Sequence, residues 1–162
     1  MIRLLLIRHA TAAPGDPDEE RPLSPKGREE AARMGRWVAA QGLVPDEVLC
    51  SGARRTRETL DLMLPAWSPA PRVSHLDELY AAGPEAVLER LGHAEAGTVA
   101  VVGHNPAMGV LAERLAREPR EGGFLPASVA ALSFEAEGWD AIGEALGTGA
   151  LLAFAAPGDV PA

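Results

Sequence analysis

The sequence predicts an α/β fold, with three layers (helix, sheet, helix) around a mostly parallel central sheet. Segments of strand length alternate with segments of helical periodicity up to about residue 127. The first segment, Ile2 to Ile7, is continuously apolar, as in a strand that is buried on both faces. Two further strand-like segments near the C-terminus complete the pattern. A length of 162 residues fits a single domain over residues 1–162.

Local signals place the individual elements. Residues 12–22 are rich in Pro, Gly and Asp and predict a loop. Ser24 and Pro25 suit the N-cap and first position of a helix, which Gly42 ends. The remaining elements are expected in this order: strand 47–50, helix 54–63, brief strand 72–74, helix 84–91, strand 98–102, helix 106–117 and strands 129–134 and 151–154.

Composition limits the cellular setting and the partners. The net charge of −8 disfavours nucleic acid and anionic membrane surfaces as partners. The lone cysteine, Cys50, cannot form a disulfide within the chain, which fits a reducing compartment. The apolar run before Arg8 is too short for a signal peptide or a membrane span. We therefore expect a cytoplasmic protein.

Polar residues directly follow three of the predicted strands, in residues 8–11 (Arg-His-Ala-Thr), 51–56 (Ser-Gly-Ala-Arg-Arg-Thr) and 103–106 (Gly-His-Asn-Pro). Ligands of open α/β sheets bind at the carboxyl ends of the strands, so these segments should meet at one edge. Guanidinium groups bind phosphate oxygens, and imidazole can serve as nucleophile, acid or base. No Cys, His or carboxylate set has metal-ligand spacing, and neither common nucleotide-binding glycine motif is present. The pattern predicts a metal-free anion site with two histidines.

These segments also resemble a known family. Leu5-Leu6-Ile7-Arg8-His9-Ala10 is similar to the signature of the histidine phosphatase superfamily, which includes the phosphoglycerate mutases. Residues 51–59, Ser-Gly-Ala-Arg-Arg-Thr-Arg-Glu-Thr, are similar to its second sequence block. Residues 21–27 (Arg-Pro-Leu-Ser-Pro-Lys-Gly) and 102–106 (Val-Gly-His-Asn-Pro) resemble its phosphohistidine phosphatase subgroup more narrowly. The resemblance extends from residue 2 to about residue 113.

The resemblance implies a role for each residue of the strand ends. His9 would be the nucleophile and would form a covalent phosphohistidine. Arg8 and Arg55 would hold the phosphoryl oxygens, and His104 would donate a hydrogen bond to one of them. Helical spacing separates Arg54 and Arg55 by about 100°, so both should not face the site.

Two further residues are weaker candidates. Arg21 precedes a loop-to-helix boundary and could reach the phosphate, but an ordinary surface arginine is an equally good interpretation. Glu78 is the best candidate for a proton donor to a leaving oxygen. A solvated carboxylate is as consistent with its position.

The resemblance implies a phosphatase without metal or other cofactor. Short length leaves little room for a lid over a small substrate, and an open site suits a phosphorylated side chain of another protein. We therefore expect hydrolysis of phosphohistidine on a protein. Two alternatives stay open: a phosphatase of small phosphate esters, and a catalytically idle phosphate-binding module. The sequence leaves the oligomeric state open.

Overall fold

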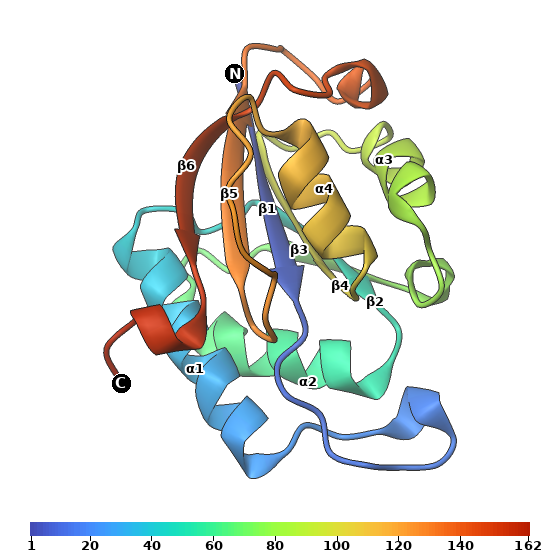
Figure 1. Ribbon diagram of the computed structural model, residues 1–162, viewed down its shortest axis with the longest axis vertical. Coiled ribbons are helices and arrows are strands. Elements are labelled where there is room, and N and C mark those ends of the chain that lie inside the picture. The colour runs from blue at the N-terminus through green and yellow to red at the C-terminus, as the bar shows by residue number, and fades with distance from the viewer.

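The computed structural model describes all residues, 1–162, and centres on a six-stranded sheet of order β3-β2-β4-β1-β5-β6 (Figure 1). β1 pairs in parallel with β4, and β2 pairs in parallel with both β3 and β4. β5 runs antiparallel to its neighbours β1 and β6. The predicted mostly parallel sheet is confirmed. The strands are β1 (Ile2–Arg8), β2 (Glu47–Ser51), β3 (Arg72–Leu76), β4 (Thr98–Gly103), β5 (Val129–Phe134) and β6 (Ala150–Ala155).

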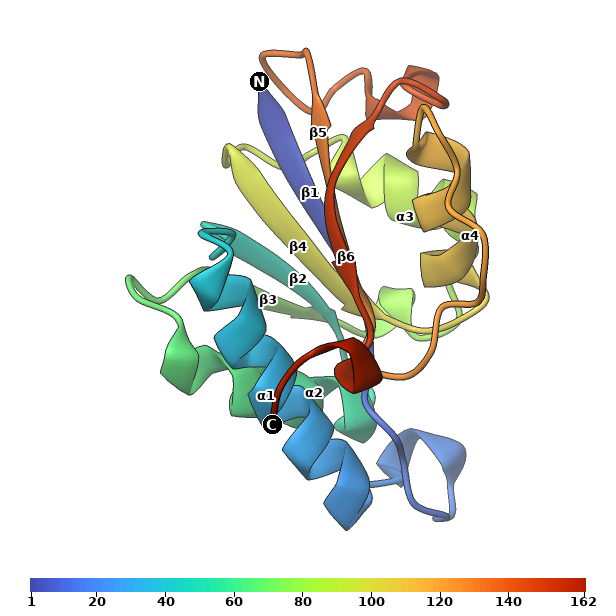
Figure 2. The same cartoon turned by 60° about the vertical axis from the view of Figure 1, so that its left-hand side comes forward.

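Helices cover both faces of the sheet, which confirms the three-layer prediction (Figure 2). On one face lie α1 (Pro25–Ala40) and α2 (Arg54–Met63), and on the other α3 (Pro84–Leu91) and α4 (Ala107–Leu115). β1 supplies both cores because successive side chains of a strand point to opposite faces. Leu5 and Ile7 pack with the α1 and α2 core, whereas Leu4 and Leu6 pack with the α3 and α4 core.

The predicted boundaries agree with the structure to within a few residues. The Ser24 hydroxyl accepts a hydrogen bond from the Gly27 N–H at 3.0 Å and so caps α1. β3 is longer than expected and extends to Leu76, because it follows β2 along that strand's full length. α4 begins one residue later than predicted, with Pro106 as its N-cap. No helix is both long and apolar enough to cross a membrane.

One connection lies beyond the ends of the strands. The segment between β1 and α1, drawn in blue, extends past the carboxyl end of the sheet in both ribbon views (Figures 1 and 2). It contains a single 3-10 turn, Asp18–Glu20. Its start is anchored, because the Thr11 carbonyl accepts hydrogen bonds from the backbone and hydroxyl of Ser24. This segment therefore borders the edge at which the strand-end residues meet.

Candidate active site

The backbone of His9 is fixed on both sides at the end of β1. Its N–H donates to the Gly103 carbonyl of β4 at 3.0 Å, and its carbonyl accepts from the Ala127 N–H at 3.0 Å. These bonds hold His9 between the central strand and the loop that precedes β5. Because both backbone groups are held, the His9 side chain projects from a fixed position.

The side chain of His9 has one defined tautomer. Its Nδ1 lies 2.7 Å from the Ala10 carbonyl, which can only accept, so Nδ1 carries the proton. The Nε2 atom therefore keeps its lone pair. Burial lowers the pKa of His9 to about 4, and the positive charges of Arg55 and Arg8 act in the same direction. The imidazole is neutral at pH 7, as a nucleophile must be.

Arg8 and Arg55 bring two guanidinium groups to the same edge. Arg8 Nη1 donates to the Phe124 carbonyl at 3.0 Å, and Arg55 is only 7 % exposed. The Nε–H groups of both arginines are buried and have no hydrogen-bond partner. An unpaired buried donor costs about 1–3 kcal/mol, so both groups are suited to an added acceptor. Arg54 instead is exposed and donates to Glu58 at 3.1 Å, as helical spacing predicts.

His104 lies next to His9, with ring centroids 5.4 Å apart. Its Nε2 lies 2.8 Å from the hydroxyl of Ser51, a fully buried residue. The Ser51 oxygen already accepts from the Ala53 N–H, so its own proton is available for Nε2. When the Ser51 hydroxyl donates to Nε2, the proton of His104 is on Nδ1, which has no partner within the chain. Burial, with the charge of Arg55, lowers the pKa of His104 to about 4.

Thr59 joins the segment that follows His9 to the helix that carries Arg55. Its buried hydroxyl accepts from the Ala10 N–H at 3.0 Å and donates to the Arg55 carbonyl at 2.7 Å. One side chain thus fixes the position of α2 relative to the end of β1. Both Thr59 and Ser51 belong to the motif segment 51–59, but sequence reasoning gave neither of them a role.

Asp18 and Tyr80 complete the cluster, and sequence reasoning missed both. The Asp18 carboxylate accepts from Arg55 Nη2 at 3.1 Å and from the Tyr80 hydroxyl, and its carbonyl accepts from Arg55 Nη1 at 2.9 Å. The Tyr80 ring stands edge-on to His104, with centroids 5.5 Å apart. No signal in the sequence could have identified Asp18, because it is one of several acidic residues in a loop.

Arg21 and Glu78 form no hydrogen bond or ion pair with His9 or His104. Arg21 donates to the Ala13 carbonyl at 3.1 Å and to Asp18 Oδ1 at 3.2 Å, so it contacts the cluster through Asp18. The Glu78 side chain is 66 % exposed, and its nearest cation is Arg90 at 3.9 Å. Glu78 lines a separate hollow of about 310 Å³ that no residue of the cluster borders. The catalytic role of Glu78 stays a prediction without geometric support.

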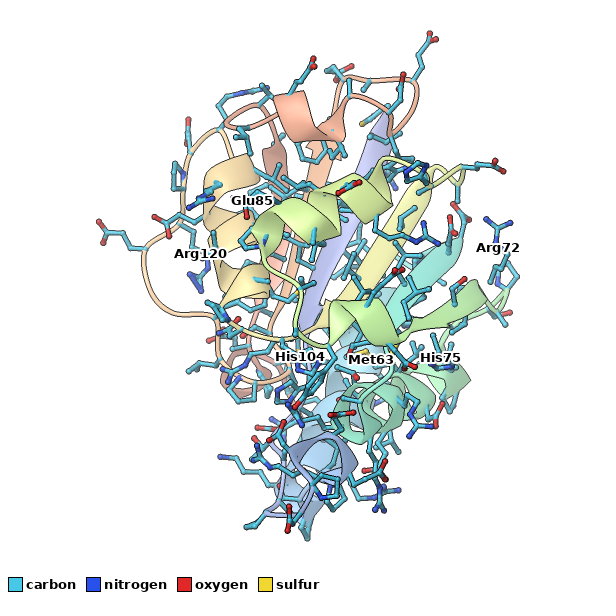
Figure 3. All side chains as sticks on the ribbon, turned by 90° about the vertical axis from the view of Figure 1, so that its right-hand side faces the viewer. Met63, Arg72, His75, Glu85, His104 and Arg120 are labelled. Carbon is cyan, nitrogen blue, oxygen red and sulfur yellow. The ribbon has the colours of Figure 1, made fainter.

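The remaining histidines lie elsewhere. His75 is exposed on the edge strand β3, away from His104 (Figure 3). His93 lines the same hollow as Glu78. The structure contains no group of three or more His, Cys, Asp or Glu side chains that could hold a metal ion. Burial raises the pKa of the Cys50 thiol to about 12, so this cysteine is not a competing nucleophile.

This edge of the α/β sheet joins two neutral imidazoles to two guanidinium groups with unused donors, an arrangement suited to a tetrahedral oxyanion. Residues 4–81 match the histidine phosphatase superfamily (branch 1). The chain belongs to this superfamily, which confirms the family predicted from the sequence.

Three relatives illustrate the similarity. Rv1276c of Mycobacterium tuberculosis, an uncharacterised protein, is 39% identical over 114 residues, which cover 68% of this chain and 70% of the relative. The structure of a candidate phosphohistidine phosphatase SixA from Nakamurella multipartitia superposes with a TM-score of 0.83 at 31% identity and covers 96% of each chain. Phosphohistidine phosphatase SixA of Escherichia coli is 25% identical over 142 residues, which cover 85% of this chain and 88% of that protein.

Proposed function

We propose that this protein is a phosphatase that hydrolyses protein phosphohistidine through a covalent phosphohistidine on His9. The observation that carries the proposal is the state of the His9 ring. Its Nδ1–H is donated to the Ala10 carbonyl, its Nε2 lone pair is free, and its pKa of about 4 keeps it neutral. Two guanidinium groups with unused Nε–H donors lie at the same edge.

In the first step the Nε2 lone pair of His9 attacks phosphorus in line with the leaving group. A new N–P bond forms as the bond between phosphorus and the leaving group breaks, and the electron pair of that bond goes to the leaving group. Arg8 and Arg55 stabilise the charge on the phosphoryl oxygens, and His104 donates from Nδ1. These donors are oriented before substrate binds, because Phe124 holds Arg8 and Ser51 holds His104.

In the second step water attacks phosphorus of the His9 intermediate. The N–P bond breaks, its electron pair returns to Nε2, and inorganic phosphate leaves while one water proton passes to solvent. None of these steps uses a metal ion, and the arginines alone balance the negative charge of the phosphoryl group. Metal independence is therefore part of the proposal.

The protonation states of the site favour phosphohistidine over a phosphate ester as substrate. Asp18 is the carboxylate that contacts the cluster, and hydrogen bonds from Tyr80 and Arg21 lower its pKa to about 2. It therefore has no proton to give to a leaving oxygen at pH 7. A phosphohistidine whose second ring nitrogen is protonated leaves as neutral imidazole and needs no proton from the enzyme. Two relatives named as phosphohistidine phosphatases support this choice.

The test measures phosphate release from a phosphohistidine-bearing protein and from an aryl phosphate, with a chelator present. We expect faster turnover of the phosphohistidine protein, and a loss of at least about 1000-fold for His9→Asn. His75→Asn, which changes an exposed histidine on β3, is the matched control and should keep full activity. Labelled phosphate should be trapped on His9 by rapid quenching.

The other outcomes separate the alternatives. Faster turnover of the aryl phosphate would favour a phosphatase of small esters. Phosphate binding without turnover of either substrate would indicate an idle binding module. Activity that survives His9→Asn, or that disappears with the chelator, would overturn the mechanism.

A further inference from the structure

The short helical turn between β1 and α1 places one carboxylate, that of Asp18, against the phosphoryl-binding residues. Asp18 Oδ2 accepts from Arg55 Nη2 and from the Tyr80 hydroxyl, and Oδ1 accepts from Arg21 Nη1 at 3.2 Å. Its backbone carbonyl accepts a hydrogen bond from Arg55 Nη1. Both terminal nitrogens of Arg55 therefore already donate to Asp18, and the Nε–H is the one without a partner.

The neighbours of Asp18 show that this contact is specific. Glu19 and Glu20 belong to the same turn and carry the same charge, but they are exposed and form no hydrogen bond or ion pair with another side chain. Asp18 alone is held by three donors from three separate parts of the chain. An ordinary solvated acidic turn would not be tied to the guanidinium and the phenol that flank His104.

The charge of Asp18 is permanent and reaches the reacting groups. Hydrogen bonding keeps its pKa near 2, so the carboxylate is ionised throughout the neutral range. Its field acts on His104, whose pKa it raises against the larger effect of burial. A substrate bound at Arg55 and His104 thus experiences one fixed negative charge beside the positive charges of the arginines.

We propose that Asp18 determines the substrate specificity of this site: its carboxylate disfavours dianionic phosphate esters and favours substrates whose leaving group carries a positive charge. The inference rests on the proposed phosphatase function and adds a residue that discriminates between substrate classes. A phosphate ester and inorganic phosphate bring only negative charge, which Asp18 repels. A phosphohistidine with a protonated ring places a cation at the mouth of the site, which Asp18 attracts.

Asp18 also orients Arg55, and the test must separate that contribution from charge. Asp18→Asn keeps one oxygen that can accept from Arg55, removes the charge and replaces the other acceptor oxygen with an amide group. A loss of orientation lowers kcat/KM for every substrate by a common factor, whereas a charge effect moves the two substrates in opposite directions. The ratio of the two kcat/KM values therefore reports the charge effect alone.

The experiment compares wild type, Asp18→Asn and Glu19→Gln on a phosphohistidine-bearing protein and an aryl phosphate. For Asp18→Asn we expect the ratio of kcat/KM values to shift by about tenfold toward the aryl phosphate, as for loss of one partly screened charge. Glu19→Gln, the matched loss of charge without the contact, should shift the ratio by less than about twofold. The shift should shrink at high salt. An unchanged ratio, or a shift toward phosphohistidine, would overturn the proposal.

Binding of inorganic phosphate, measured by calorimetry, keeps this test independent of turnover. We expect Asp18→Asn to bind phosphate about threefold more tightly than wild type. If neither substrate is hydrolysed by wild type, the proposed function fails and the calorimetry still decides the role of Asp18. Equal or weaker phosphate binding by the variant would overturn it.

Discussion

The site consists of two groups of residues that differ in how the chain holds them. The residues at strand ends and on α2, here called the strand-anchored group, are buried or half-buried. His9 is bonded to Gly103 and His104 to Ser51 of the sheet, and the Arg55 carbonyl accepts from Thr59. The carboxylates of the second group are exposed, with half of the Asp18 side chain and 66 % of the Glu78 side chain open to solvent. In the proposed mechanism the first group surrounds the reacting atoms, and the second lies at the rim.

This difference sets the size of the effect that each group can have. A charge or donor in a buried, water-poor environment interacts strongly and keeps its direction. An exposed charge is screened by water and salt, so it adjusts selectivity without supplying most of the rate. Substitutions in the strand-anchored group should therefore abolish or strongly reduce turnover, and substitutions at the rim should have small effects.

Arg55→Lys should give the largest effect among the supporting residues. Lysine keeps the charge but loses the planar fork and the buried Nε–H that has no partner in the chain. We expect kcat/KM to fall about 100-fold, as when one preorganised donor is removed from an oxyanion site. Arg54→Lys, which changes the exposed neighbour paired with Glu58, is the matched control. A loss in kcat/KM below about threefold for Arg55→Lys would mean that Arg55 does not belong with the residues that supply most of the rate.

Acid should destabilise the protein through the two buried histidines. Folding lowers the pKa of His9 and of His104 to about 4, below the usual value near 6.5, so the unfolded chain binds more protons between these pH values. Their contribution to stability is complete above about pH 6.5 and is lost as the pH falls toward 4. We expect a loss on the order of 2 kcal/mol, after allowance for screening of the partly buried rings.

Denaturant unfolding at several pH values measures this loss. The double variant His9→Asn, His104→Asn should have a flatter profile between about pH 6.5 and 5.5, where most carboxylates are still ionised. His75→Asn, on the exposed edge strand, should keep the slope of the wild type. Equal slopes for wild type and the double variant would mean that the rings are not held in a neutral, buried state.

The difference between strand-anchored and loop residues also explains which parts of the site could be predicted from the sequence. Strand and helix positions follow from apolar periodicity and capping residues, so the sheet edge, and with it the meeting of residues 8–9, 55 and 104, could be predicted. Asp18 and Tyr80 could not, because the path of a loop is set by contacts such as that of Arg21 with the Ala13 carbonyl, which leave no periodic trace. Sequence context alone points to Glu78, and its carboxylate lies beside Arg90 in another hollow, so its catalytic role stays a prediction.

Ser51→Ala tests whether a buried residue acts through its neighbour. The variant removes the hydroxyl that is hydrogen-bonded to His104 Nε2 and so leaves the tautomer and orientation of the ring undefined. We expect kcat to fall about tenfold with little change in KM, since the donor is needed most as charge develops. Ser133→Ala, a buried serine of β5 that pairs with Arg3 at the other end of the sheet, should leave kcat unchanged. Equal losses in both variants would indicate a general packing effect.

Glu78→Gln should give the smallest effect and is the sharpest test of the difference between the two groups. If Glu78 supplied the leaving-group proton, its loss would lower kcat on an aryl phosphate by about 100-fold or more and would remove the alkaline limb of the pH profile. Its exposed carboxylate beside Arg90 predicts a change below about twofold at every pH. A phosphohistidine substrate is the internal control, because its protonated ring needs no acid from the enzyme. A large loss on the aryl phosphate alone would mean that Glu78 moves into the site during turnover. The division between strand-anchored residues that supply the rate and rim residues that adjust selectivity would then fail.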